Sequence, residues 1–382
     1  MRNTLGLLFL AAALAGCSAN PVTGKNELHL ISTKDEIAQG QQYYAPSRQA
    51  QGGDLVTDPA LTAYVQRVGA KVATASDRAL PYEFVVLASG VPNAWALPGG
   101  KIAVNRGLLL ELEDEAELAA VLGHEVTHAA ARHGAQAQER AMLAQAGMIA
   151  AAVTLGDDAN ANVVLGAAAL GTALITTKYG RDAELQSDRY GIRYMAKAGY
   201  DTQGAVSLQQ KFVALSKGRK PGWLEGMFAS HPPSDERVVA NQRHAAALPP
   251  GGTREREAYQ AATAKIRKSK DAYAAYDVGR AALAKGDAKA ALAAAQKAIV
   301  GEPREALFYA LVGDAQAKAG NPKAARAAYD AAIERNPGYF GFWLERGLLR
   351  QAAGDKAGGR ADLEKAHALL PTKASQDALA RP

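Results

Sequence analysis

Residues 121–133 read VLGHEVTHAAARH, and this stretch decides how the rest of the chain is interpreted. In a helix of about 3.6 residues per turn, His124 and His128 lie on one face, so both imidazoles can reach a single ion. Zinc binds imidazole nitrogen at tetrahedral sites, and Glu125 projects beside that face, where it could take a proton from water. The alternative is two helix histidines without a metal, but the chain has only 7 histidines in 382 residues. The stretch therefore predicts a Zn²⁺ site, one per chain.

The composition indicates a mostly helical globular protein of two or three domains. Hydrophobic residues make up 48% of the chain and charged residues 21%, and aromatic residues only 6%, which favours close-packed, alanine-rich helices. The formal net charge is +6, and it is spread thinly, which argues against a nucleic-acid partner. The most basic run, residues 254–270, is interpreted as a solvated helical linker, with an anionic partner there as the alternative.

The first 30 residues are typical of an exported, lipid-anchored protein. Residues 1–16 have one positive charge, an apolar run and a small-residue end, as a signal peptide does. Residues 14–17 read LAGC, which resembles the lipobox of bacterial lipoproteins, so Cys17 would carry the lipid. The alternative is a buried free cysteine, and a single cysteine cannot form an internal disulfide. Ser18 follows in place of the aspartate that retains lipoproteins at the inner membrane, so we expect the periplasmic face of the outer membrane.

A candidate substrate-binding strand precedes the histidine helix. Residues 82–88 and 101–105 are predicted strands, and NAWALPGG lies between them at residues 93–100. As an edge strand, this stretch would leave backbone groups free to pair with an extended peptide. The residues concerned are Asn93, Ala94, Trp95 and Ala96. An ordinary hairpin whose Trp95 fills the core is an equally good interpretation.

A catalytic zinc usually has a third protein ligand, and the sequence narrows the choice. His133 would lie about 140° around the helix from His128 and point away from the metal, and Gly134 stands where an extended HExxHxxGxxH motif needs histidine. Downstream, Glu184 and Asp188 share one face of a predicted helix. One carboxylate can bind zinc while the other accepts the free N–H of a ligand histidine. Solvated surface carboxylates are the alternative.

Five ordered motifs carry a family resemblance. They are NPVTG, NAWALPGG, EAELAAVLGHEVTHAAARHGAQ, RDAELQSDRYG and SHPPSDER. Together they closely resemble the HtpX and CAAX-prenyl-protease family of zinc metallopeptidases, a gluzincin family, and within it the soluble periplasmic lipoproteins with a tetratricopeptide (TPR) tail. The resemblance implies His124, His128 and Glu184 as zinc ligands and Glu125 as general base. It implies that Asp188 contacts one of the zinc ligands and not the metal. It implies a mainly α fold with a small β-sheet, an α+β zincin-like domain.

The last of these motifs adds a histidine and an arginine. From the sequence alone, His231 before two prolines is a loop histidine. The resemblance implies that it is either an oxyanion donor or an extra zinc ligand that caps a latent site, and that Arg237 organises the cleft. The apolar residues 141–177 are too interrupted for a convincing membrane span. We expect helices around the site, with a membrane-touching or lid role as the alternative.

The C-terminal part repeats with a period of 34 residues. Glycines recur at 279, 313 and 347 and again at 286, 320 and 354, and prolines at 303, 337 and 371. This period predicts about three TPR helical hairpins, an all-α solenoid that binds other proteins. The expected division is a signal peptide (1–16), a lipidated tether (17–30), a zinc metallopeptidase domain (31–250), a helical linker (251–270) and TPR-like repeats (271–382).

The sequence therefore predicts a zinc metalloendopeptidase tethered by lipid and served by a protein-binding tail. By resemblance, its substrates would be misassembled envelope proteins, and its partners outer-membrane proteins and their assembly machinery. The alternative is a chaperone or assembly factor for outer-membrane proteins in which proteolysis is secondary or latent. The two hypotheses are compatible, because a client-docking module can feed a protease.

Overall fold

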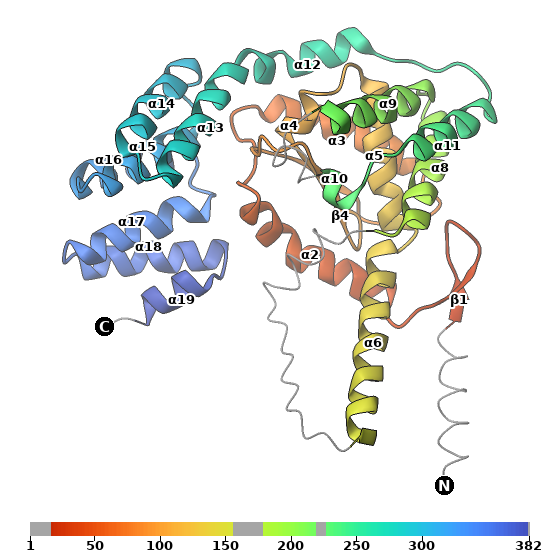
Figure 1. Ribbon diagram of the computed structural model, residues 1–382, viewed down its shortest axis with the longest axis horizontal. Helices are drawn as coiled ribbons and strands as arrows, with labels where there is room; N and C mark the ends of the chain where they lie inside the picture. The colour runs from red at the N-terminus through yellow and green to blue at the C-terminus, as the bar shows by residue number, and fades with distance from the viewer. Residues whose placement is uncertain (1–16, 156–178, 219–226, 381–382) are drawn as a thin grey trace.

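The computed structural model describes residues 17–155, 179–218 and 227–380. A helical domain with a small sheet is joined through α12 (Arg256–Lys268) to a curved row of helical hairpins that turns back toward α2 (Thr33–Ala50), as Figure 1 shows. The predicted fold class, mainly α with a small β-sheet followed by an all-α tail, is confirmed. Among the helices in the described ranges, none combines the length and apolar character needed to cross a bilayer.

The small sheet places one strand at an edge. β3 (Glu83–Leu87) pairs in parallel with β5 (Lys101–Asn105), which pairs antiparallel with β4 (Ala94–Leu97), giving the order β3-β5-β4. The β4–β5 turn contains Gly99 and Gly100, whose φ angles of 78° and 87° suit glycine. No described strand pairs with the outer side of β4. The predicted edge strand and the predicted hairpin are therefore the same structure.

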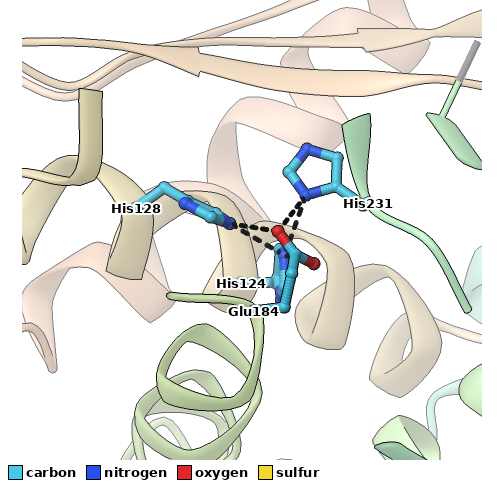
Figure 2. Close-up of side chains that lie close together, drawn as sticks. All are labelled: His124, His128, Glu184 and His231. Atoms are coloured by element: carbon cyan, nitrogen blue, oxygen red, sulfur yellow. Dashed lines mark hydrogen bonds and ion pairs between the residues drawn. The ribbon is translucent and has the colours of Figure 1, made fainter. Parts of the chain in front are cut away.

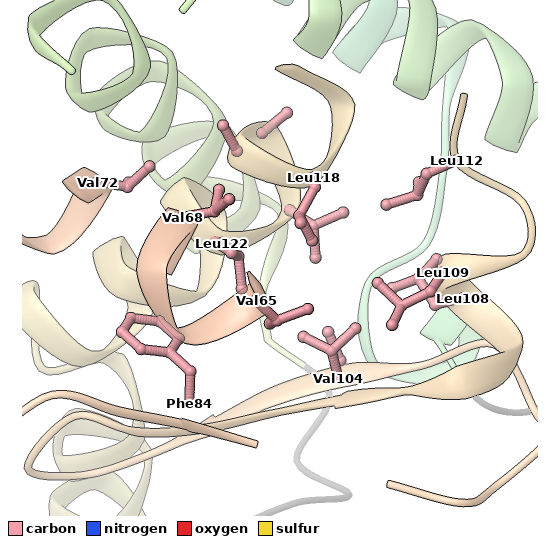
Figure 3. Packing of buried hydrophobic residues seen from close by; sticks show 14 of the residues in the cluster. Val65, Val68, Val72, Phe84, Val104, Leu108, Leu109, Leu112, Leu118 and Leu122 are labelled. Atoms are coloured by element: carbon pink, nitrogen blue, oxygen red, sulfur yellow. The ribbon is translucent and has the colours of Figure 1, made fainter. Parts of the chain in front are cut away.

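The main core lies between the sheet and two helices, α3 (Pro59–Thr74) and α5 (Glu115–Ala130). Asp58 caps α3 by accepting the N–H of Leu61, and Asp114 caps α5 by accepting that of Glu117. Aliphatic side chains from both helices and from β5 meet in one cluster (Figure 3). Every residue of α5 is buried, so this helix is a rigid support for the side chains it carries.

Helix α8 (Arg181–Lys197) packs directly against α5. A Cβ added at Gly123 would lie 2.9 Å from the carbonyl oxygen of Gly191, and one at Gly191 would lie 2.8 Å from the carbonyl carbon of Gly123. The two helices thus touch backbone to backbone at this crossing. The short helix α10 (Met227–Ser230), α9 (Gln203–Gly218) and α11 (Asp235–Ala246) complete this side of the domain.

The first described residues, 17–28, are packed on the domain. β1 (Cys17–Ala19) and β2 (Asn26–Leu28) form an antiparallel hairpin. The Asn20 side-chain amide donates to the carbonyl oxygen of Ala131 at 2.8 Å, at the end of α5. Buried polar bonds of this kind fix the hairpin to the domain.

A residue in the left-handed conformation separates α5 from the next helix. Arg132 has a φ of 64°, a left-handed conformation uncommon for a residue with a side chain, and α6 (His133–Leu155) starts directly after it. Most of the expected helical packing of residues 141–177 lies outside the described residues.

The linker prediction for residues 251–270 is wrong in one respect: α12 is not solvated all round. Tyr259, Thr263 and Ile266 form a buried stripe on it, and the Tyr259 hydroxyl donates to the carbonyl oxygen of Leu109 at 2.6 Å. The helix belongs to the core of the first domain.

The tail consists of three helical hairpins and a final short helix. They are α13 (Lys270–Ala284) with α14 (Ala288–Gly301), α15 (Ala306–Lys318) with α16 (Pro322–Arg335), α17 (Phe340–Ala352) with α18 (Lys356–Leu369), and α19 (Lys373–Leu379). The second helices begin 34 residues apart, as the sequence period requires. The tail contacts α2, because the Gln49 amide bonds the carbonyl oxygen of Gly338 at 2.7 Å and the N–H of Phe340 at 2.9 Å.

Candidate metal centre

Four buried side chains from three segments converge on one point. His124 and His128 come from α5, Glu184 from α8, and His231 from the loop directly after α10. One ligand atom of each lies within 4.8 Å of those of all the others. Figure 2 shows the three rings and the carboxylate directed toward one another. Residues far apart in the sequence thus assemble one compact donor group.

The spacing of these donors fits a tetrahedral zinc ion. Zinc binds nitrogen and oxygen at about 2.0–2.1 Å, so neighbouring donors of a tetrahedral site lie roughly 3.3 Å apart. His124 Nε2 lies 3.0 Å from His128 Nε2 and 3.3 Å from His231 Nδ1. The Glu184 carboxylate lies 3.4 Å from each α5 ring and 2.9 Å from His231 Nδ1. Three ring nitrogens and a carboxylate oxygen packed this closely are the donor set that zinc prefers.

The backbone contact between α5 and α8 makes this approach possible. His124 directly follows Gly123, and Asp188 and Glu184 precede Gly191 by one and two helical turns. Since no side chain separates the helices at the glycine pair, the carboxylates of α8 reach the rings of α5 without long extended side chains. The size of the donor group is therefore set by the helix crossing.

An arginine and an aspartate hold the donors from behind. Asp188 Oδ1 lies 3.0 Å from His124 Nδ1, the nitrogen that faces away from the cluster. Arg237 donates to both oxygens of Asp188 at 2.7 Å, and its Nη1 lies 2.9 Å from Glu184 Oε2. The arginine neutralises the two buried carboxylates, and the aspartate fixes the ring orientation of His124.

Burial and charge act in opposite directions on these groups. Burial works to lower the pKa of His124, but the Glu184 and Asp188 carboxylates outweigh it and raise that pKa to about 10. Burial also works to raise the pKa of Glu184, yet the charges of His231 and His124 hold it well below its usual range. The pKa of His128 is lowered well below 6.5, with burial as the largest cause. The cluster therefore strongly stabilises a negative charge at Glu184.

Glu125 faces the cluster but does not belong to it. Its residue surface is 3% exposed, its Oε2 has no hydrogen-bond partner among the described residues, and its Oε1 lies 3.8 Å from His231 Nε2. Burial raises the pKa of this carboxyl. A cavity of about 40 Å³ lies beside Glu125 and His231. It can hold water but not a peptide.

One expectation about the site is wrong. His133 does not point away from it, because the break at Arg132 ends the helix on which that prediction relied. His133 Nδ1 instead lies 2.9 Å from His128 Nδ1, and His133 Nε2 lies 3.4 Å from Gln186 Oε1. Burial lowers the pKa of His133 to about 4. Sequence reasoning missed this neutral partner of His128.

The part of the chain that contains the site matches a known protein family. The model of "Peptidase family M48" matches residues 59–244. "Metalloprotease YcaL" of Escherichia coli (strain K12) is 30% identical over 257 residues, which cover 62% of this chain and 96% of that protein.

The chain belongs to peptidase family M48.

Longer M48 relatives match in part. "Putative beta-barrel assembly-enhancing protease" of Vibrio cholerae serotype O1 is 30% identical over 229 residues, 58% of this chain and 46% of that protein. The beta-barrel assembly-enhancing protease of Escherichia coli (strain K12) is 27% identical over 60% of this chain and 48% of its own length. The chain thus spans about half the length of these curated relatives. Among solved structures, the Arabidopsis OM64 TPR domain aligns with 29% of this chain at 19% identity and a TM-score of 0.29.

The M48 domain brings most of the predicted site residues together. The three expected ligands lie at the metal centre. So do four other predicted site residues: Glu125, Asp188, His231 and Arg237. Asn93 precedes β4 and Ala94–Leu97 form it; Trp95 is buried against Tyr44, with ring centroids 6.1 Å apart. Cys17 lies in β1. Tyr179, which stacks on His128 at 4.0 Å, was not foreseen, because nothing in its sequence position distinguishes it.

Proposed function

We propose that the chain is a zinc-dependent endopeptidase of the gluzincin type, with His124, His128 and Glu184 as metal ligands and Glu125 as general base. One observation carries the proposal: four buried donors at tetrahedral spacing stand beside a carboxylate oxygen that has no partner among the described residues. A structural cluster would gain nothing from three imidazoles and a carboxylate held this close without a cation. The family membership supports the same conclusion.

A bound zinc ion would polarise the scissile carbonyl and lower the pKa of a water molecule to about 7. Glu125 accepts the proton of the attacking water and delivers it to the departing amine. The outward backbone groups of β4 pair with the substrate and align it. Asp188 keeps Nε2 of His124 free by accepting the N–H at Nδ1.

His231 gives the enzyme a latent resting state. Its Nδ1 occupies the fourth corner of the donor group, the place that a catalytic site keeps for water or substrate. The adjacent cavity of about 40 Å³ has no room for a peptide. Substrate binding then requires the loop after α10 to withdraw His231. In the resting position His231 Nε2 lies 3.8 Å from Glu125 Oε1, so a small displacement would leave the ring near the reacting carbonyl as an oxyanion donor.

The clients and the location follow from the tail, the anchor and the relatives. The name of these relatives, beta-barrel assembly-enhancing protease, favours envelope proteins, among them misassembled outer-membrane proteins, as substrates. We assign the chain to the periplasmic face of the outer membrane, anchored by lipid at Cys17. The TPR-like repeats dock clients or the assembly machinery.

A second function, that of a chaperone or assembly factor, is favoured by the same His231. A site closed at its fourth corner is inactive until opened, while the tail can bind partners without cleavage. In this case the peptidase would act rarely, and binding would be the main activity.

Glu125→Gln tests the first function, because it removes the base and keeps all four donors. The full-length variant should still bind one zinc per chain but should fail to cleave a denatured β-barrel membrane protein. Cleavage retained by this variant would contradict the mechanism. If the variant also corrects an envelope defect in cells as well as wild type does, while a chain without residues 271–382 does not, the assembly function is favoured.

A further inference from the structure

A second, larger cavity lies between the peptidase domain and the TPR-like repeats. Its volume is about 620 Å³. Residues 88–91, Asn93 and Arg106 form its wall on the peptidase side, and Tyr276, Arg280 and Tyr339 form it on the tail side. Nothing in the metal centre uses this space, although Ser230, which also lines it, directly precedes His231.

Arg106 is a buried cation at this cavity, and the carboxylates of Asp277 and Glu305 act on it electrostatically without forming a direct ion pair. Its residue surface is 3% exposed, its Nε donates to the carbonyl oxygen of Ala88 at 3.3 Å, and its Cζ lies 3.5 Å above the ring of Tyr273. Within the described part of the chain, neither terminal nitrogen has a hydrogen-bond partner and no carboxylate forms an ion pair with it. A buried guanidinium left in this state is stabilised by a planar anionic acceptor such as a carboxylate.

The same cavity offers acceptors for peptide N–H groups. Asn93 Oδ1 and Asn105 Oδ1 are buried, and neither has a hydrogen-bond partner among the described residues. Asp277 also lines the cavity and forms no ion pair within the described ranges. Tyr276 and Tyr339 supply flat apolar surfaces. Donors for a carboxylate, acceptors for N–H groups and aromatic walls together suit a polypeptide rather than an inorganic anion.

The direction of β4 sets the direction in which a bound peptide would run. A peptide that pairs antiparallel with β4 runs its carboxyl end past Ala94 toward Asn93, and so into the cavity. The opposite wall contains residues 50–52 and Tyr339, and the bonds of Gln49 to Gly338 and Phe340 join α2 to the tail beside it. The unpaired terminal nitrogens of Arg106 at this point favour a chain end, because only the end of a polypeptide carries a backbone carboxylate.

We propose that this cavity binds the free C-terminal carboxylate of an extended polypeptide, with Arg106 and Arg280 as donors. The inference rests on the proposed function in one step, the pairing with β4, and it names the part of the client that is recognised. Arg280 already donates to the Tyr276 hydroxyl at 3.1 Å, which places its guanidinium at the cavity wall. Asp277, whose carboxylate interacts electrostatically with both arginines, accepts the adjoining peptide N–H.

Binding to the full-length Glu125→Gln protein tests this proposal without cleavage. The probe is a fluorescein-labelled pool of random octapeptides without Asp or Glu, prepared as free acids and as C-terminal amides, and followed by fluorescence anisotropy. The free acids should bind at least about tenfold more tightly. Arg106→Gln and Arg280→Gln should each remove most of this preference. Arg335→Gln is the matched control, because this guanidinium also lies over a tyrosine ring, 3.7 Å from that of Tyr309, but does not line the cavity.

Each outcome decides the proposal. Arg280 is exposed, so its variant reports on binding even if the buried Arg106 is needed for folding. Equal binding of acids and amides, no binding of either, or an acid preference retained in the Arg280→Gln protein overturns it. If an amidated pool with one internal glutamate binds as tightly as the free acids, the site recognises side chains and the C-terminal assignment is wrong. If the wild-type protein failed to cleave unfolded protein, the proposed function would be refuted. The preference for free C-terminal carboxylates, measured by binding alone, would still stand.

Discussion

The Nδ1 atoms of His128 and His133 lie 2.9 Å apart, although the two residues belong to different helices. If Nε2 of His128 holds the proposed metal, its Nδ1 carries the proton and donates to Nδ1 of His133. His133 can accept because burial lowers its pKa to about 4, which keeps the ring neutral. Its own N–H then faces Gln186 Oε1 at 3.4 Å. This chain of contacts would fix the tautomer of one proposed zinc ligand.

His133→Ala should weaken zinc binding by roughly 10- to 100-fold, since His128 loses the group that orients it. Competition with a chromogenic chelator measures the affinity. His367→Ala, in the TPR-like repeats, is the control and should bind zinc as wild type does. An unchanged affinity in His133→Ala would mean that the contact does not orient the ligand.

Arg237→Met should destabilise the metal-free protein by roughly 3–5 kcal/mol, because it leaves the Asp188 and Glu184 carboxylates buried and uncompensated. Denaturant unfolding measures the loss. Arg181→Met removes a similar two-bond pair with Glu236, but there the arginine side chain is 72% exposed, so stability should hardly change. Similar losses for the two variants would contradict the assignment.

Gly123→Ala should both destabilise the domain by about 1–3 kcal/mol and weaken zinc binding, because the added methyl pushes α8 away from α5. The two ligands on α5 would then lie too far from Glu184. Gly180→Ala is the control at the start of α8, where an added Cβ has no atom within 4 Å. Stability lost with zinc affinity intact would separate packing from ligand spacing.

His231→Ala should increase the rate at which unfolded protein is cleaved, because it frees the fourth corner of the donor group. The stoichiometry of bound zinc should stay at one per chain. A lower rate with zinc retained would instead assign His231 to the oxyanion, with no capping role. Single-turnover cleavage separates these two outcomes.

Glu305→Gln should raise the thermal midpoint at pH 8, with less effect near pH 4. Glu305 is buried, and burial raises its pKa although the Tyr273 hydroxyl donates to it. A carboxyl whose folded pKa is raised favours the protonated form, so its contribution to stability is present at low pH and is lost as the pH rises through that folded pKa. Glu334→Gln is the exposed control. A difference in midpoint that does not change with pH would contradict this account.

Local periodicity predicted the parts of the site that lie on single helices. The spacing of His124 and His128, and that of Glu184 and Asp188, each define one helical face, and the 34-residue period defined the tail. The position of His133 could not be predicted, because the left-handed backbone at Arg132 turns it back to the site, and an arginine gives no sign of such a turn. The contact of Gly123 with Gly191 joins residues of two helices, and periodicity within one helix cannot reveal it.

The burial of α12 shows a different limit. Tyr259, Thr263 and Ile266 lie on one face of α12, but the many charges around them suggested a solvated helix. Whether such a stripe is covered depends on a partner elsewhere in the chain, here the residues near Leu109. Likewise, the order β3-β5-β4 follows from a parallel pairing between strands separated by β4 in the sequence.

If Cys17 carries lipid, the bond from Asn20 to Ala131 would limit how far the proposed catalytic centre can reach. Only Ser18 and Ala19 would then separate the lipidated residue from Asn20, which is fixed to the end of α5; the three residue steps span about 10 Å when fully extended. The connection between the lipid and the domain would then be too short for the domain to move far from the membrane. The peptidase would meet only those polypeptides that linger within one protein diameter of the bilayer surface, so proximity would select its clients before any sequence preference does.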